Sequence, residues 1–379
     1  MNLILLSTEK NLFIKGSTAR LRIEKYNSIA ENLFYFVYVP KGSNFKEEKI
    51  ASNITIYPVE SRFKIFGLIS SIFKVFNFIK RGKFLAENTL ISSQDPFEIG
   101  LASWIISLVS GLPLHIQIHV DFFNNFYKYE SIRQFIQFYL ASFVIRRAKE
   151  IRAVSPRIKK YLIERLNILN SKITFIPVYA DLVYIRNYLP KLNIKSKYSE
   201  FETIILMASR MVKQKYILLA IKAFKNVVKE YPKTGLLLVG SGPEEIHAKE
   251  LVDNLRLNNN VRFEPWVSSI NDYLKTADIF CLSSNYEGYP LVLFEASAAP
   301  IAIVTTDVGC AGDYIINNQN GLVVSVGNVY ELSQALIKVV KSKELRSQLS
   351  KSVLENSVHY MSESDYHEMM KESWLKTLK

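Results

Sequence analysis

Residues 285–297, NYEGYPLVLFEAS, carry two carboxylates, Glu287 and Glu295, eight positions apart in a mostly apolar stretch. Such a pair could be a catalytic acid pair, ligands for a hydroxyl-bearing molecule, or two solvated surface acids. A carboxylate only accepts hydrogen bonds, so its natural partners here are the vicinal hydroxyls of a ribose or a hexose. Pro290 suits the first turn of a helix, which leaves Glu287 in the preceding loop and Glu295 inside the helix. The two acids therefore fit separate parts of one elongated ligand better than a shared proton transfer.

Two basic residues, Arg210 and Lys215, lie in the segment IILMASRMVKQK, between a strand-like run that ends near Ala208 and a helical pattern from Tyr216. Arginine can hold phosphate oxygens through two parallel hydrogen bonds, and lysine adds a mobile point charge. Two cations at the end of a strand suit a diphosphate. The alternative is that both are ordinary solvent-exposed loop residues.

A second loop of interest, Gly240-Ser241-Gly242-Pro243, follows the apolar run LLLV and precedes a helical pattern. Glycine lets the backbone approach a ligand closely, and the N-terminus of a helix attracts anions. The loop is not a full dinucleotide fingerprint, and a plain strand-to-helix turn explains the spacing equally well.

These loops must be positioned by strands that alternate with helices along the whole chain. Apolar runs such as Leu3–Leu6 and Leu114–His119 in the first half, and Thr203–Ala208 and Ile279–Leu282 in the second, are separated by longer helical patterns. This alternation predicts βαβ units and parallel sheets, and 379 residues are too many for one ordinary core. We therefore expect an α/β protein with two Rossmann-like, doubly wound domains that face each other across a cleft.

The expected domain boundaries follow from the polar, aperiodic stretch RNYLPKLNIKSKYS. They are an N-terminal domain over residues 1–190, a linker over 191–202, a C-terminal domain over 203–360, and a terminal helix over 361–379 that packs back toward the N-terminal domain.

Composition and cysteine usage favour a cytoplasmic globular protein. The two cysteines, Cys281 and Cys310, form neither a disulfide framework nor a zinc cluster. The N-terminus reads as a buried strand and not as a signal peptide. The longest uncharged run, Ile99–Ile118, is interrupted by Gly-Leu-Pro, which favours a buried helix to Ser110 and a strand from Leu114 over a membrane span.

The net charge of +13 raises the question of an anionic partner. Residues 61–85 contain six basic side chains and no acid, interleaved with apolar residues at helical spacing. Such a segment could lie on the inner face of an anionic membrane, or it could be an internal helix with a solvated basic face. Nucleic acid is not expected as a partner because the chain has no recognition motif.

The segment from Ser283 to Asn328 resembles the core of the retaining glycosyltransferases of family 4, which have the GT-B fold. Glu287 and Glu295 match the two-glutamate motif of that family, and ASRMVKQK resembles its Gly-Arg-Leu…Lys segment. The resemblance is specific from Arg210 to Gly321 and weaker in the first half, where RAVSPRIKKYLIERLNILNSKITFIPVYADL and SQDPFEIGLASW resemble the acceptor-side core.

The resemblance implies a role for each matched residue. Arg210 and Lys215 would neutralise the departing donor diphosphate, Glu287 would face the donor sugar, Glu295 would bind the ribose, and His119 would lie near the reacting groups. Asp121 is close enough in sequence to assist His119. The other residues that it places around the donor are Gly16, Gly240, Gly242, Gly288, Tyr289, Pro290 and Leu291.

Several positions depart from the family pattern. They are Ser209 and Tyr216 around the cationic segment, Val178-Tyr179 in place of an Asn-Gly pair, Cys310 in place of a glycine, and Gly16 in place of a glycine pair. These changes affect acceptor geometry and sugar preference more than the class of reaction. Cys310 is either a reactive thiol or an inert small residue.

The sequence thus predicts a retaining, metal-independent glycosyltransferase without a cofactor. Its expected partners are a nucleotide-diphosphate sugar and a lipid-linked or oligosaccharide acceptor, in cell-surface polysaccharide or lipid-linked glycan synthesis. The main alternative is a catalytically silent GT-B subunit that binds a partner or a glycan. An epimerase, a phosphorylase and a glycosidase fit less well, the last because the two glutamates are not poised across one bond.

Overall fold

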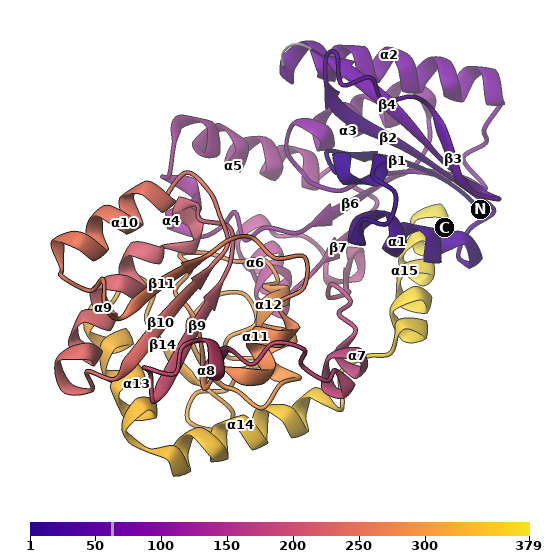
Figure 1. Ribbon diagram of the computed structural model, residues 1–379. Coiled ribbons are helices and arrows are strands. Elements are labelled where there is room, and N and C mark those ends of the chain that lie inside the picture. Colours follow the sequence, from indigo (N-terminus) through magenta and orange to yellow (C-terminus); the bar gives the residue numbers. More distant parts are fainter. Residues whose placement is uncertain (62–63) are drawn as a thin grey trace. The chain divides into compact units, whose positions relative to one another are not determined.

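The computed structural model describes residues 1–61 and 64–379, and within them the chain forms two compact units (Figure 1). Unit 1 contains residues 1–177 and 363–379, and unit 2 contains residues 178–362. The sequence analysis assigned residues 178–190 to the N-terminal domain and 191–202 to a linker. Ala180, Leu182, Ile185 and Ile194 are instead buried in a core of unit 2, because their apolar side chains pack against its sheet and helices.

Unit 1 is built on an eight-stranded sheet in the order β3-β4-β2-β1-β5-β6-β7-β8, in which only β3 is antiparallel to its neighbour. Its strands are β1 (Asn2–Ser7), β2 (Asn32–Pro40), β3 (Glu48–Ala51), β4 (Ile54–Ser61), β5 (Thr89–Ser93), β6 (Leu114–Ile118), β7 (Glu150–Ala153) and β8 (Ile173–Phe175). The sequence analysis did not expect β3, whose four residues, EKIA, are too short and polar to show a strand pattern.

The helices of unit 1 cover the faces of this sheet. They are η1 (Lys10–Phe13), α1 (Thr18–Glu24), η2 (Lys25–Ser28), α2 (Lys64–Gly82), α3 (Glu98–Ser110), α4 (Asn125–Lys128), α5 (Ile132–Ile145), α6 (Pro156–Leu166), η3 (Asn170–Lys172) and α15 (Glu363–Leu378). As expected, the uncharged run that begins at Ile99 forms a helix to Ser110 and then the strand β6. No helix within the described residues is both long and apolar enough to cross a membrane.

Helix α15, yellow in Figure 1, is the last helix in sequence but belongs to unit 1, where it packs on β5, β6 and β7. Its Trp374 side chain is completely buried. Ser373 Oγ lies 3.1 Å from His115 Nε2 on β6, and the hydroxyls of Tyr366 and Tyr26 are 2.8 Å apart. The helix therefore supplies a share of the core and of the buried polar contacts of unit 1.

Helix α2 contains most of the basic segment 61–85, of which Arg62 and Phe63 lie outside the described residues. The Phe78 ring packs against Phe34 and Phe36 of β2, with centroid distances of 4.8 and 5.4 Å. Val75 and Ile79 are also buried. The apolar face of this helix thus covers the sheet, as in the internal-helix alternative.

Unit 2 is built on a fully parallel six-stranded sheet in the order β11-β10-β9-β12-β13-β14. Its strands are β9 (Thr203–Ala208), β10 (Thr234–Val239), β11 (Val261–Glu264), β12 (Ile279–Leu282), β13 (Ala302–Thr306) and β14 (Leu322–Val324). Its helices are α7 (Leu182–Asn187), α8 (Ile194–Lys197), η4 (Lys213–Lys215), α9 (Ile217–Glu230), α10 (Glu245–Asn254), α11 (Asn271–Thr276), α12 (Leu291–Ser297), α13 (Val329–Lys341) and α14 (Lys343–Ser357).

The strand order of unit 2 has a direct functional meaning. The chain winds outward from β9 to β11, then returns and winds the other way from β12 to β14. Loops that follow β9 and β12 therefore leave the sheet side by side and diverge, and ligands of such sheets bind at this switch point. The expected α/β class with two doubly wound, Rossmann-like domains is confirmed.

Candidate active site

The predicted cationic and acidic loops of unit 2 meet at its switch point. The loop after β9 carries Gln214 and Lys215, and the loop after β12 carries Asn285 and Glu287. The backbone N–H of Asn285 donates to the Gln214 carbonyl at 2.8 Å, which joins the two loops directly. Residues that are far apart in sequence are thus brought together by adjacent parallel strands.

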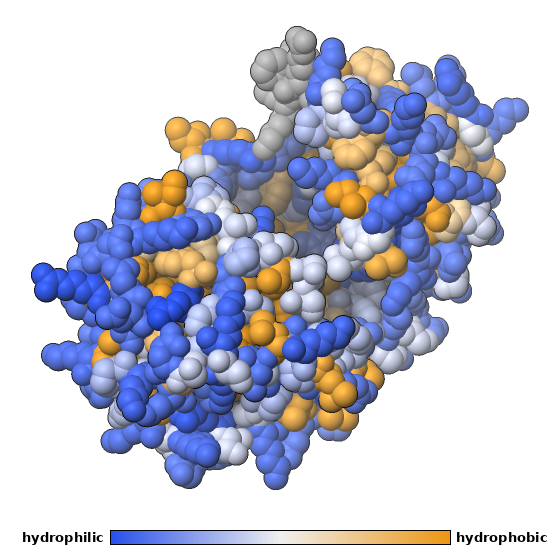
Figure 2. Space-filling view, viewed as in Figure 1, coloured by the Kyte–Doolittle hydropathy of each residue, from blue (hydrophilic) through white to orange (hydrophobic). Residues whose placement is uncertain are grey.

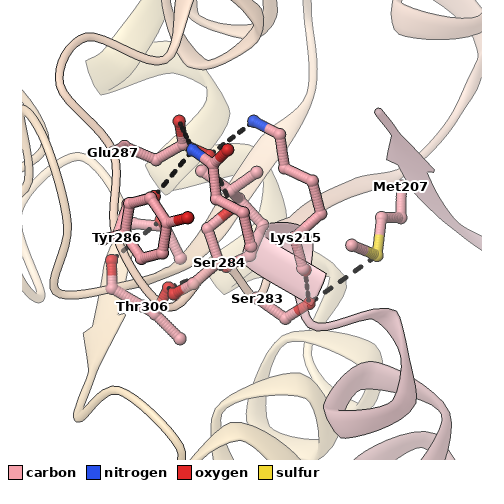
Figure 3. A network of polar contacts seen from close by, with 10 residues as sticks. Met207, Lys215, Ser283, Ser284, Tyr286, Glu287 and Thr306 are labelled. Carbon is pink, nitrogen blue, oxygen red and sulfur yellow. Dashed lines mark hydrogen bonds and ion pairs between the residues drawn. The ribbon is translucent and has the colours of Figure 1, made fainter. Parts of the chain in front are cut away.

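Glu287 is held by three side chains (Figure 3). Lys215 Nζ lies 2.5 Å from its Oε1, Ser284 Oγ donates to the same oxygen at 2.6 Å, and Gln214 Nε2 donates to Oε2 at 3.2 Å. The Lys215 and Glu287 side chains are only 13% and 7% exposed. An ammonium has three donors, so the contact with Glu287 leaves Lys215 able to donate to a further group.

The loops themselves are fixed by hydrogen bonds behind the ion pair. Thr306 Oγ1 on β13 donates to the Ser284 carbonyl at 2.7 Å. Ser283 Oγ donates to the Lys215 carbonyl at 3.0 Å (Figure 3). Neither contact was expected from the sequence, and neither was the role of Gln214. The available signal was a run of polar residues directly after a buried strand, which is where the polar groups of a parallel sheet gather.

Gly309, in the loop after β13, packs closely against the loop that carries Glu287. It has a positive φ of 58°, and a Cβ atom there would lie 2.5 Å from Pro290 Cδ and 3.2 Å from Glu287 Cβ. Only glycine fits this approach without moving the loop of Glu287. The sequence analysis considered the neighbouring Cys310 but not Gly309.

Glu295 lies on α12, outside the hydrogen-bond network of Glu287. In the described part of the chain its carboxylate has no hydrogen-bond or ion-pair partner, and burial raises its pKa above the ordinary value. A carboxylate that is partly removed from water without a partner is costly, and a ligand that donates hydrogen bonds would lower that cost. The two glutamates thus differ in environment.

Arg210 differs from Lys215 in that its side chain is exposed and, within the residues that the structure describes, unpaired. Its loop is supported from below by Gly240 and Gly242, at φ values of 141° and 153°. A Cβ at Gly240 would lie 2.0 Å from the Ser209 carbonyl oxygen, and one at Gly242 would lie 2.4 Å from that of Met211. Close packing against the Arg210 loop is therefore a sufficient reason for both glycines.

The remaining residues of the EGYP motif are packed into unit 2. Gly288 and Pro290 are buried, Leu291 begins α12, and the ring of Tyr289 stacks on Phe294 with a centroid distance of 4.2 Å. The Tyr289 hydroxyl lies 3.1 Å from that of Tyr360. Tyr289 thus has a packing role of its own in unit 2.

The interdomain stretch that departs from the family pattern is tied to the same aromatic group. The Tyr360 hydroxyl donates to the Val178 carbonyl at 2.6 Å. Since only the backbone oxygen of Val178 is used, this bond tolerates the change from the usual Asn-Gly pair.

Both cysteines are buried. Burial raises the pKa of the Cys281 thiol to about 12, and Cys310 is 2% exposed within the core of unit 2. Reactive thiols need a stabilised thiolate and access to solvent. The structure therefore supports the inert alternative for Cys310.

His119 follows β6 in unit 1. Its Nε2 lies 3.3 Å from Gln117 Oε1, an atom that also accepts from Arg152 at 2.9 Å. Because the Gln117 oxygen can only accept, Nε2 carries the proton and Nδ1 is the acceptor. Burial, assisted by the Arg152 charge, holds the His119 pKa well below its usual value, so the ring is neutral.

Two further residues of unit 1 were considered for the site: Gly16, from the resemblance, and Asp121, because it is close in sequence to His119. Asp121 is buried, and burial raises the pKa of its carboxyl to about 6. Gly16 is exposed in the turn before α1, at a left-handed φ of 76°, and nothing lies within 4 Å of where its Cβ would be. Its requirement for glycine is therefore set by backbone conformation and not by packing within the chain.

Parts of the chain are similar in sequence to known glycosyltransferases. Residues 191–355, which make up most of unit 2, match the family model described as Glycosyl transferases group 1. N-acetyl-alpha-D-glucosaminyl L-malate synthase of Bacillus anthracis is 29% identical over 176 residues, which are 46% of each chain. The amylovoran biosynthesis glycosyltransferase AmsD of Erwinia amylovora is 23% identical over 316 residues, which are 80% of this chain and 83% of that protein.

Among solved structures, Alr3699/HepE of Anabaena in complex with UDP superposes with a TM-score of 0.76 at 15% identity and covers 99% of each chain. This likeness shows the GT-B fold, as the sequence resemblance predicted. The chain spans less than half of the length of the first curated relatives that it matches.

Proposed function

We propose that the protein is a glycosyltransferase that moves a sugar from a nucleotide-diphosphate donor to a hydroxyl acceptor. The observation that carries the proposal is the pairing of Lys215 with Glu287 at the switch point of unit 2, with Arg210 exposed on the same loop. This arrangement supplies cations for a leaving diphosphate next to a carboxylate for sugar hydroxyls. The group 1 domain and the fold shared with a UDP complex support it.

In this proposal the residues of unit 2 divide the donor between them. Arg210 and Lys215 hold the diphosphate as its bond to the sugar breaks, and their charges stabilise the leaving group. Glu287, already fixed by Ser284 and Gln214, accepts from sugar hydroxyls. Glu295 accepts from the ribose hydroxyls, which gives its unpaired carboxylate hydrogen-bond donors.

We further propose that transfer retains the anomeric configuration and needs no metal. The name of the Bacillus anthracis relative specifies an α-linked product, which is the anomer that retention gives from an α-configured donor. The cations of Arg210 and Lys215 neutralise the leaving diphosphate, as a metal ion does in other transferases. The neutral His119 offers Nδ1 as an acceptor for a sugar hydroxyl.

The proposed acceptor is a lipid-linked or polysaccharide hydroxyl, used at the cytoplasmic face of the membrane. Support comes from the Erwinia amylovora relative, which is named for polysaccharide biosynthesis, and from the basic residues of α2. The silent-subunit alternative gives no reason for Arg210, Lys215, Glu287 and Glu295 to occur together, and we do not favour it.

A donor screen tests the enzyme proposal. The purified chain is mixed with single nucleotide sugars and a membrane extract, and nucleotide release is measured against a Glu287→Gln variant prepared in parallel. We expect release with at least one donor, and a large loss in the variant. Donor binding without turnover in any extract, or no binding at all, would favour the silent subunit.

A further inference from the structure

Helix α5 of unit 1 exposes an apolar stripe along its length. Ile132, Ile136 and Tyr139 are 81%, 58% and 54% exposed, and Phe143 continues the stripe at 39%. These positions recur at helical spacing, so they share one face, while Ala141 and its buried neighbours face the core. Figure 2 shows hydrophobic surface where Figure 1 places α5. An apolar face of this extent on a folded unit normally marks an interaction surface.

The neighbouring helices also expose apolar side chains, and α3 packs against both α5 and α2. The ring of Trp104 on α3 meets that of Phe143 on α5 edge to face, with a centroid distance of 5.1 Å. Together the exposed apolar residues of the three helices form what we term the outer face: Ile69, Phe73, Leu108, Val109, Ile132, Phe135, Ile136, Tyr139 and Phe143.

The charges on the helices of the outer face are mostly positive, although Glu130 lies just before the N-cap of α5. On α2, α3 and α5 the described basic side chains are Lys74, Lys80, Arg81 and Arg133, and the single acid of these helices is Glu98. Glu98 and Arg133 form an ion pair at 3.0 Å, so the two together add no net charge to the surface. Arg146 and Arg147 directly follow α5, and the Arg147 guanidinium lies 3.4 Å from the centre of the Phe143 ring. The apolar surface thus has a basic rim.

We propose that the outer face binds an anionic membrane surface, with α5 lying in the interface between headgroups and acyl chains. Aliphatic and aromatic side chains enter that interface, and lysine and arginine contact the anionic headgroups. A second copy of the chain fits less well, because a self-complementary contact would bring two basic rims together. This inference rests on the membrane contact in the proposed function. It assigns the main apolar contact with the membrane to α5 instead of α2, and it does not depend on the transfer reaction.

The test is co-sedimentation of the full chain with vesicles of equimolar phosphatidylglycerol and phosphatidylcholine, and with vesicles of phosphatidylcholine alone. The wild type is expected to sediment with the anionic vesicles only. The double variant Ile132→Ser, Ile136→Ser should bind them roughly tenfold more weakly or worse, because two apolar side chains are lost from the interface. Ile246→Ser on α10 is the matched control, since Ile246 is 68% exposed but belongs to unit 2.

A second pair of changes tests the charge. Lys80→Gln with Arg81→Gln should weaken binding to the anionic vesicles several-fold, and added salt should do the same. The proposal is overturned if the wild type does not sediment with anionic vesicles, or if the α5 double variant binds as the wild type does.

Light scattering distinguishes a second copy from a membrane. If the wild type is a dimer and the α5 double variant a monomer, the outer face is a protein interface and the proposal fails. Donor binding by each variant in solution reports separately on the site in unit 2. A variant that binds donor but not vesicles isolates the surface, whereas vesicle binding without any donor binding contradicts only the proposed function.

Discussion

Lys215 Nζ lies 2.5 Å from Glu287 Oε1, although 72 positions separate the two residues in sequence. They follow β9 and β12, the adjacent strands at which the sheet of unit 2 changes its direction of winding. The pair is largely removed from water, so each charge depends on the other and on any ligand that reaches them. This contact links the stability of unit 2 to its proposed chemistry.

The ion pair should couple energetically. Lys215→Met leaves the buried Glu287 without its counter-charge and should lower the free energy of unfolding by about 2–4 kcal/mol. Glu287→Gln should cost less, because the amide oxygen still accepts from Ser284. The double variant should cost less than the sum of the single changes, by roughly 1 kcal/mol or more. Urea unfolding of all four proteins measures this, and strict additivity would contradict a direct interaction.

Arg210 should matter for turnover and not for stability. Its side chain is exposed and, among the described residues, unpaired, so Arg210→Ala should change the free energy of unfolding by less than about 0.5 kcal/mol. We expect turnover to fall about 100-fold or more, because the variant lacks the cation that stabilises the leaving diphosphate. The loss of donor affinity should be smaller. Lys213→Ala is the control, because Lys213 is an exposed cation of the same loop. If the two changes had equal effects, Arg210 would act only through its long-range charge and not through direct contact with the diphosphate.

Glu295 should show a conflict between stability and donor binding. Burial raises the folded pKa of Glu295 above its unfolded value. The contribution of this group to the free energy of unfolding is therefore fully present below about pH 4 and is lost as pH rises through the folded pKa. Glu295→Gln should therefore raise the melting temperature near neutral pH and have no such effect in acid. The same change should weaken donor binding, as titration calorimetry would show. A variant that is no more stable at neutral pH would mean that Glu295 is already satisfied.

Gly240 should be needed to support the Arg210 loop. In Gly240→Ala the new methyl would meet the Ser209 carbonyl oxygen, so the loop must move. Gly312→Ala is the matched control, because Gly312 also has a positive φ, 88°, but nothing lies within 4 Å of its Cβ position. Strain alone should cost the control on the order of 1 kcal/mol, and Gly240→Ala should cost clearly more in thermal unfolding. Similar losses in both variants would show that backbone strain, not the contact, sets the requirement.

Most of the strands named from the sequence could be predicted because strands buried in a parallel sheet are continuous apolar runs in the sequence. The apolar runs at Thr203–Ala208 and Ile279–Leu282 are the strands β9 and β12 without adjustment. A strand such as β3 escaped prediction because it lies at an edge and has few apolar residues. The boundary at residue 190 was wrong for a related reason, since the polar stretch before residue 200 hides a few apolar side chains, such as Ile194, that anchor it to unit 2.

For the candidate site, the sequence indicated residue types but not contacts. Spacing and the family resemblance located Lys215 and Glu287, yet neither could show that they touch, because that contact depends on which strands are neighbours. For Gly240 and Gly242 the sequence suggested close approach, and the structure shows an approach to the backbone of Ser209 and Met211. The part of Gln214 in holding Glu287 had no sequence signal of its own, since an isolated glutamine in a loop is usually solvated.

The place of α15 in unit 1 has a consequence for how the protein is made. The sheet of that unit is complete once β8 has left the ribosome, but one face of β5, β6 and β7 stays uncovered until residues 363–378 have been synthesised. Unit 2 lies entirely between these two events in the order of translation. During that interval His115 lacks its hydrogen-bond partner Ser373, and the core position that Trp374 will occupy is empty. Unit 1 begins folding first and finishes last, so nascent chains of this protein should depend on protection from aggregation longer than their compact units suggest.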